Sequence, residues 1–140
     1  MLIDCLPSLS LRTVSARIAA DRVLLITQPR YFSVQQVGNL LDTVDVVRVN
    51  YNADLELLGV IVNQWRAQRR EGVLRLAELD EFFGDGVVWR PLVTDLAVIE
   101  ESACDGVPVR SLRRTGARRS RLAFDDLAAR LIEEVAHVHS

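Results

Sequence analysis

The sequence contains no lysine, and all 17 of its basic residues are arginine. It also has no segment of the form G-x-x-x-x-G-K-[ST], the loop whose backbone amides and lysine hold the phosphates of a nucleotide. The 140 residues therefore carry no complete phosphate-binding loop.

Cysteine and long apolar runs are equally scarce. Cys5 and Cys104 are the two cysteines, and they form neither a disulfide framework nor a metal-ligand spacing. No apolar run approaches the roughly 18 residues of a membrane-spanning helix, and no basic region precedes the first apolar stretch as in a signal peptide. With 49% hydrophobic and 26% charged residues, the sequence predicts a cytoplasmic globular protein with no membrane contact.

The first nine residues, MLIDCLPSL, join a short apolar run to an aspartate and a turn. This pattern is typical of a buried parallel strand that delivers one carboxylate, here Asp4, to the carboxyl edge of a sheet, where open α/β folds place their ligand site. A strand end with a capping aspartate is the alternative. We expect a strand at residues 2–4, followed by a helix that Ser8 or Ser10 caps and that runs to about Ala20. The apolar face of this helix is expected to hold Leu11, Val14 and Ile18.

Two further segments, 22–28 and 57–63, are short, apolar and β-branched, as in strands covered on both faces. A weaker strand is expected over 87–93, interrupted by Pro91 and so short or at an edge. Helices are expected from residue 34 to about 50, from the end of the basic loop 66–70 to about Phe83, over 97–104 and over about 121–137. The first of these has one apolar stripe, formed by Val34, Val37, Leu40, Leu41, Val44 and Val47. The alternation of strands and helices predicts an α/β fold with a mainly parallel sheet and flanking helices.

Several stretches, in this order, resemble the ParA/Soj family of partition ATPases in the deviant-Walker P-loop class. The first is LIDCLPSLSLRTVSARIAAD, which is similar to the family's Walker B segment and the helix after it. The others are TQPRYFSVQQVGNLLDTVDVVR, NADLELLGVIVN and VTDLAVIEESACDGVPV. The chain departs from the family pattern at Leu6, Ser10, Arg30 and Thr94.

The resemblance implies one partial ParA-like domain over residues 1–140, from the Walker B strand to the C-terminal helix. By family, such a protein binds ATP and Mg²⁺, forms an ATP-dependent dimer, binds DNA non-specifically, answers to a ParB-like stimulating partner and is nucleoid-associated. Because the phosphate loop and its lysine are missing, we expect this chain alone to bind no cofactor and not to hydrolyse ATP.

The resemblance also assigns roles to single residues. Asp4 corresponds to the Walker B carboxylate, which helps to hold Mg²⁺ through water. Asn63 closes a strand at the ligand edge, where its amide suits the edge of an adenine; an asparagine that caps the strand end or turn is the alternative. Thr94 and Asp95 are expected to flank the same base, with a simple turn as the alternative.

A basic segment follows, with six arginines in twelve residues, and the resemblance makes it the candidate DNA contact by counterion release. A solvated helix face is the alternative, although cations at a helix N-terminus oppose its dipole. Arg66, Arg69 and Arg70 form a weaker second candidate. The arginines of the basic segment are Arg110, Arg113, Arg114, Arg118, Arg119 and Arg121.

Two other hypotheses stay open on the sequence. The chain could be a non-catalytic binding module that pairs with a full-length partition ATPase or with DNA, and it would then have to cover the sheet edge beside residues 2–4. A receiver-like α/β domain is disfavoured because it needs a lysine near its last strand.

Overall fold

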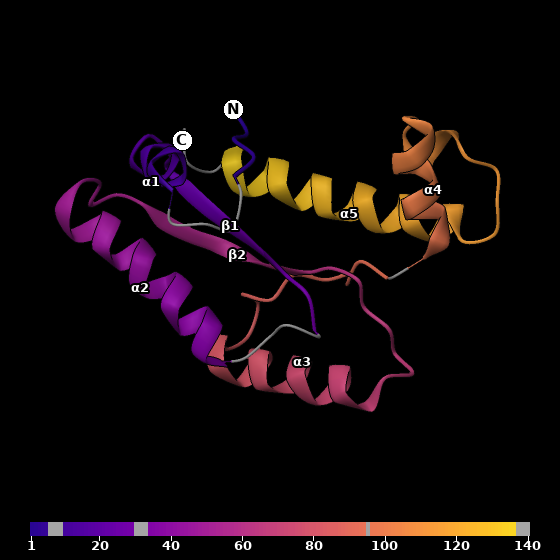
Figure 1. The fold of residues 1–140 in the computed structure, drawn as a ribbon, viewed down its shortest axis with the longest axis horizontal. Coiled ribbons are helices and arrows are strands. Elements are labelled where there is room, and N and C mark those ends of the chain that lie inside the picture. The colour runs from indigo at the N-terminus through magenta and orange to yellow at the C-terminus, as the bar shows by residue number, and fades with distance from the viewer. Residues whose placement is uncertain (6–9, 30–33, 95, 137–140) are drawn as a thin grey trace.

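The computed structural model describes residues 1–5, 10–29, 34–94 and 96–136, and the side chains of 34–36 are not described. Helices cover both sides of a small parallel sheet (Figure 1), so the predicted α/β class is confirmed. The elements in chain order are α1 Leu11–Ile18, β1 Arg22–Thr27, α2 Val34–Asn50, β2 Glu56–Val62, α3 Arg70–Phe83, α4 Ala97–Asp105, the 3₁₀ turn η1 Val109–Ser111 and α5 Ala117–Ala136.

The two predicted central strands form the sheet. β1 and β2 are parallel, with a register that runs from the Arg22–Glu56 pair to the Thr27–Val62 pair. At the carboxyl end of the ladder, the Asn63 amide donates to the Thr27 carbonyl at 2.8 Å. The two strands therefore end at the same edge, as the prediction of a ligand edge required.

The segment 87–93 lies along the other side of β2, as a broken ladder rather than a regular strand. Its first half pairs through Val60, whose amide donates to Val87 O (2.9 Å) and whose carbonyl accepts from Trp89 N (2.8 Å). Its second half pairs through Val93, whose amide donates to Val62 O at 2.9 Å. Pro91 lies between them and has no N–H to contribute, so the predicted interruption is confirmed.

In Figure 1, α2 and α3 lie on one side of the sheet and α5 lies on the other. On the first face α2 contacts both α1 and α3, and Leu25, Val60 and Val62 form a core with Val37 and Leu79 from the helices. On the second face, Trp89, Val93 and Leu127 are buried together, with Leu24, Leu58, Ile61, Ile99 and Leu131 packed against them.

Capping residues define both ends of α1 and the end of α4. Ser10 caps α1, where its hydroxyl accepts from the Thr13 amide at 3.4 Å, as one of the two predicted caps. The Asn52 side chain closes the other end of α1 by donating to Ile18 O (3.1 Å) and Ala20 O (2.8 Å). Gly106 ends α4 in the left-handed conformation that glycine adopts at low cost (φ 64°).

The structure corrects several expectations. Residues 1–5 form no strand, and Leu2 and Ile3 are exposed. A three-residue strand has few ladder hydrogen bonds of its own and needs a neighbour, and among the described residues β1 pairs only with β2. The predicted cover on both faces of β1 is also incomplete, because Ile26 is 68% exposed.

Two helix predictions were partly wrong. In α1 the buried residue is Thr13, whereas Leu11 and Ile18 of the expected apolar face are exposed. α5 begins at Ala117, four residues before the predicted start, because Ala117 and Ser120 pack inward. Among the described residues, no helix is long and apolar enough to cross a membrane.

Candidate functional site

Asp4 lies in an exposed, irregular segment before α1. The structure gives its carboxylate no polar contact within the described ranges. Residues 6–9, which follow Asp4, and Asp95 lie outside the described residues. The prediction that Asp4 lies beside the other candidate site residues therefore stays a prediction.

Asn63 and Thr94 do reach the same edge of the sheet. Asn63 directly follows β2, and Trp65, two residues later, pairs with Thr94 in a parallel bridge. The Asn63 Oδ1 atom accepts from the Gln64 amide at 2.8 Å, and Gln64 has a positive φ of 54°. The amide oxygen of Asn63 thus holds the turn, the alternative role that the sequence allowed. No hydrogen bond to its Nδ2 group is found among the described residues.

The basic segment divides into paired and unpaired arginines. Arg114 forms an ion pair with Glu101 of α4 at 2.7 Å, and Arg110 forms a longer one with Asp125 of α5 at 3.3 Å. The other four arginines are exposed, and within the described part of the chain they have no ion-pair partner. These four are Arg113, Arg118, Arg119 and Arg121.

These arginines surround the junction of α4 and α5. An open groove there, about 590 Å³ in volume, has Arg113 and Arg114 on one side and the first turn of α4 on the other. Arg118 and Arg121 follow on the first two turns of α5, three residues apart and so on one side of the helix. The segment is therefore a positive surface at one end of the molecule rather than a row along a loop.

The second basic candidate, residues 66–70, precedes α3. Arg69 and Arg70 are exposed where α3 begins, and Arg66 already has an interaction within the protein. Later on α3 the side chain of Glu78 accepts from Arg75 at 2.8 Å and raises the pKa of that guanidinium above its usual value. That ion pair belongs to the helix surface and not to either basic segment.

The candidate site residues do not make up a complete ATP–Mg²⁺ site. Asp4, Asn63 and Thr94 offer a carboxylate, an amide and a hydroxyl, which suit a metal-bound water and a base. The 140 residues offer no lysine and no glycine-rich phosphate loop. Within the described residues, no group of three or more His, Cys, Asp or Glu could hold a metal ion.

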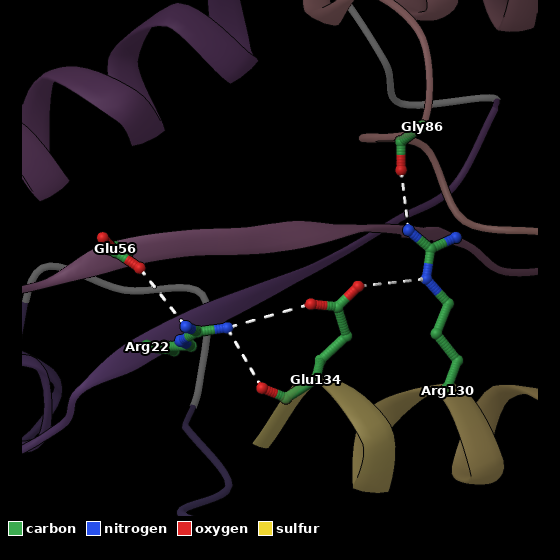
Figure 2. A network of polar contacts seen from close by, with 5 residues as sticks. All are labelled: Arg22, Glu56, Gly86, Arg130 and Glu134. Carbon is green, nitrogen blue, oxygen red and sulfur yellow. Dashed lines mark hydrogen bonds and ion pairs between the residues drawn. The ribbon is translucent and has the colours of Figure 1, made fainter. Parts of the chain in front are cut away.

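Sequence reasoning missed the residues that fasten α5 to the sheet (Figure 2). Arg22 of β1 contacts Glu56 (3.5 Å) and both the carboxylate (3.9 Å) and the backbone carbonyl (3.3 Å) of Glu134. Arg130 contacts Glu134 (3.8 Å), donates to Gly86 O (2.8 Å) and stacks on the buried Trp89 ring at 4.5 Å from its centroid. The one sequence feature that could have indicated these contacts is the i, i+4 spacing of Arg130 and Glu134, which is typical of an ion pair on a helix.

Comparisons with known proteins agree with this fold. A family model described as an AAA domain matches residues 1–57. An uncharacterised protein of Mycobacterium tuberculosis is 32% identical over 95% of this chain and 41% of its own length. The sporulation initiation inhibitor protein Soj of Bacillus subtilis is 30% identical over 78% of this chain and 43% of its own. The chromosome-partitioning ATPase Soj of Thermus thermophilus is 32% identical over 71% and 40%.

Among solved structures, cobyrinic acid a,c-diamide synthase from Mycobacterium smegmatis matches with a TM-score of 0.61. It is 24% identical, and the match covers 89% of this chain and 44% of the enzyme, so the likeness shows the fold alone. A second structure of that enzyme, with ADP and magnesium bound, matches with a TM-score of 0.58 at 22% identity, over 74% of this chain and 46% of the enzyme.

The chain spans about half or less of the length of each of these proteins. The family-model match, the Soj relatives and the shared fold agree with the motifs found in the sequence. The comparisons therefore support the resemblance of this chain to part of a ParA/Soj-type partition ATPase.

Proposed function

We propose that this chain is the DNA-contacting part of a ParA-like partition protein, a single partial domain that binds DNA without sequence preference. The observation that carries the proposal is the set of four exposed arginines, Arg113, Arg118, Arg119 and Arg121, that lack an ion-pair partner among the described residues. Unpaired guanidinium groups can contact phosphates without first breaking an internal bond, and each contact releases counterions from the DNA.

The other two arginines of the segment contribute less in this proposal. Arg114 would have to leave Glu101 at 2.7 Å, and Arg110 would have to leave Asp125 at 3.3 Å. Asp125 also places a negative charge one turn after Arg121 on α5. The proposed footprint is therefore the α4–α5 junction and the first two turns of α5, and not the whole of that helix.

The rest of the proposal follows from the family. The intact partition protein would act as an ATP-dependent dimer, answer to a ParB-like partner, and position a plasmid, a chromosome or another cargo on the nucleoid in the cytoplasm. Asp4 would assist the Mg²⁺ ion, and Asn63, Thr94 and Asp95 would lie near the base. This chain alone supplies no phosphate cradle, so we assign it no hydrolytic step of its own.

The test is the salt dependence of binding to a duplex of random sequence. For B-DNA, the logarithm of the binding constant falls with the logarithm of salt concentration by about 0.9 for each phosphate neutralised. The double variant Arg118→Ala/Arg121→Ala should therefore flatten that slope by about 1.8 and weaken binding to unrelated sequences equally.

A matched control removes the same charge elsewhere. The variant Arg12→Ala/Arg48→Ala loses two exposed arginines from α1 and α2, of which Arg48 forms an ion pair with Asp45 at 3.5 Å, and it should change the slope little. If the two double variants have the same slope as the parent chain, the DNA-binding role of the basic segment is refuted. If only the control flattens it, the DNA surface lies on α1 and α2 instead.

A further inference from the structure

The basic segment contains three hydroxyl side chains, and the structure separates them by accessibility. Ser120 of α5 is only 4% exposed. Ser111 is exposed, but it lies within the 3₁₀ turn η1, where its amide donates to Pro108 O at 2.8 Å. Thr115 is exposed, and its hydroxyl has no polar partner within the described part of the chain. Thr115 is therefore the hydroxyl of this segment that another molecule reaches most easily.

The backbone presents Thr115 at the tip of a tight turn. The Ala117 amide donates to Arg114 O at 3.1 Å, which closes a four-residue turn with Thr115 and Gly116 at its centre. Gly116 has a φ of 87°, the conformation that the third residue of a type II turn requires. Before the turn, Leu112 has an extended backbone, with φ −80° and ψ 136°. An exposed hydroxyl on such a turn can enter the peptide-binding cleft of a modifying enzyme.

Arginines lie on both sides of Thr115 in the chain. Arg113 and Arg114 directly precede it, and Arg118 and Arg119 follow three and four residues later. Residues 110–121 include no aspartate and no glutamate. Protein kinases select their substrates in part by the charge pattern around the acceptor hydroxyl. The surroundings of Thr115 therefore suit a kinase with an acidic substrate cleft.

A phosphate on Thr115 would find cations already in place. Thr115 lines the open groove of about 590 Å³ together with Arg113 and Arg114, so there is room for the added group. Arg114 is held at 2.7 Å by Glu101, the carboxylate of that groove, which leaves Arg113 as its unpaired cation. Arg118 follows in the first turn of α5. The dipole of α5 opposes these arginines but stabilises a negative charge at the same place.

We propose that Thr115 is a phosphorylation site and that its phosphate releases the chain from DNA. The phosphoryl donor is ATP bound to a serine/threonine kinase that selects arginine close before its acceptor. Thr115 Oγ1 forms a bond to the γ-phosphorus while the bond from that phosphorus to the β,γ-bridging oxygen breaks. ADP leaves, and the hydroxyl proton passes to a carboxylate of the kinase. The product carries a charge of about −1.5 to −2 at pH 7.

The release rests on the proposed DNA contact, because it uses the same arginines. Arg113 and Arg118 belong to the unpaired set, and a phosphate on Thr115 takes both of them as partners by charge-assisted hydrogen bonds. Two contacts to DNA are then lost, which should flatten the salt slope of binding by about 1.8. The binding constant at moderate salt should fall by about tenfold or more, since the phosphate also repels the duplex.

The first experiment treats the full 140-residue chain with ATP and purified serine/threonine kinases that select arginine close before the acceptor. Mass spectrometry of the digested product should locate the phosphate on Thr115. Thr115→Ser should keep the modification, because it keeps the hydroxyl, and Thr115→Ala should lose it. Modification that spares Thr115, or that persists at the same level in Thr115→Ala, would overturn the assignment of the site.

The second experiment compares DNA binding of the unmodified chain with that of a chain made with phosphothreonine at position 115. A duplex of random sequence is titrated over a salt series. The matched control carries phosphoserine at Ser15, an exposed residue of α1, which lies at the other end of the molecule from α4 (Figure 1). We expect the tenfold loss and the flatter slope only with the phosphate at position 115.

Two results would overturn the release. One is equal binding by the unmodified chain and the chain phosphorylated at position 115, and the other is equal weakening by the phosphate at Ser15. Circular dichroism of each sample checks that it folds. If the unmodified chain does not retain DNA, the proposed function and the release fail together, whereas the first experiment still decides whether Thr115 is the acceptor.

Discussion

Gly59 of β2 faces the buried ring of Trp89, and this contact is the sharpest packing constraint in the protein. A Cβ atom at residue 59 would lie 2.7 Å from Trp89 Cδ1 and 2.8 Å from Cε2, and closer still to Nε1. Ordinary contacts of this kind are 3.4 Å or longer, so the ring would have to move. Trp89 is fully buried against Val93 and Leu127, which leaves it no space to do so.

We therefore expect Gly59→Ala to destabilise the protein by about 3 kcal/mol, the upper end of the usual cost of overpacking. Urea denaturation followed by far-ultraviolet circular dichroism measures this change. Gly38→Ala is the matched control, since nothing lies within 4 Å of its Cβ position in α2, and it should stabilise by about 0.5 to 1 kcal/mol. A Gly59→Ala protein within about 0.5 kcal/mol of its parent would refute the packing described for Trp89.

Three further predictions concern single side chains. Asn52→Ala removes the donor to Ile18 O and Ala20 O and should lower the free energy of unfolding by about 1 to 2 kcal/mol in urea titration. Glu101→Gln frees Arg114 from its ion pair, so DNA binding should tighten and its salt slope steepen by up to about 0.9; an unchanged slope would show that Arg114 does not reach DNA. Glu134→Gln should lower the free energy of unfolding by less than about 1 kcal/mol, because Arg22 keeps its hydrogen bond to the backbone carbonyl of residue 134. The melting temperatures of this variant at low and high salt should then differ less than those of the parent chain.

The sequence predicted the parts of the fold that local patterns determine. The segments 22–28 and 57–63 became β1 and β2 because continuous β-branched, apolar residues suit a strand between two helical layers. The stripe of α2 was also correct, and Val37, Val44 and Val47 are buried. In each case, the signal lies within the element itself.

The errors arose where a residue depends on a distant neighbour. Residues 2–4 have the composition of a strand, but a strand exists only beside a partner, which the described residues do not provide. The six arginines looked equivalent until the fold brought Glu101 to Arg114 and Asp125 to Arg110, 13 and 15 residues away in the chain. Asn63 was correctly placed at the carboxyl edge, but its bond to Gln64 N depends on a local turn that composition does not reveal.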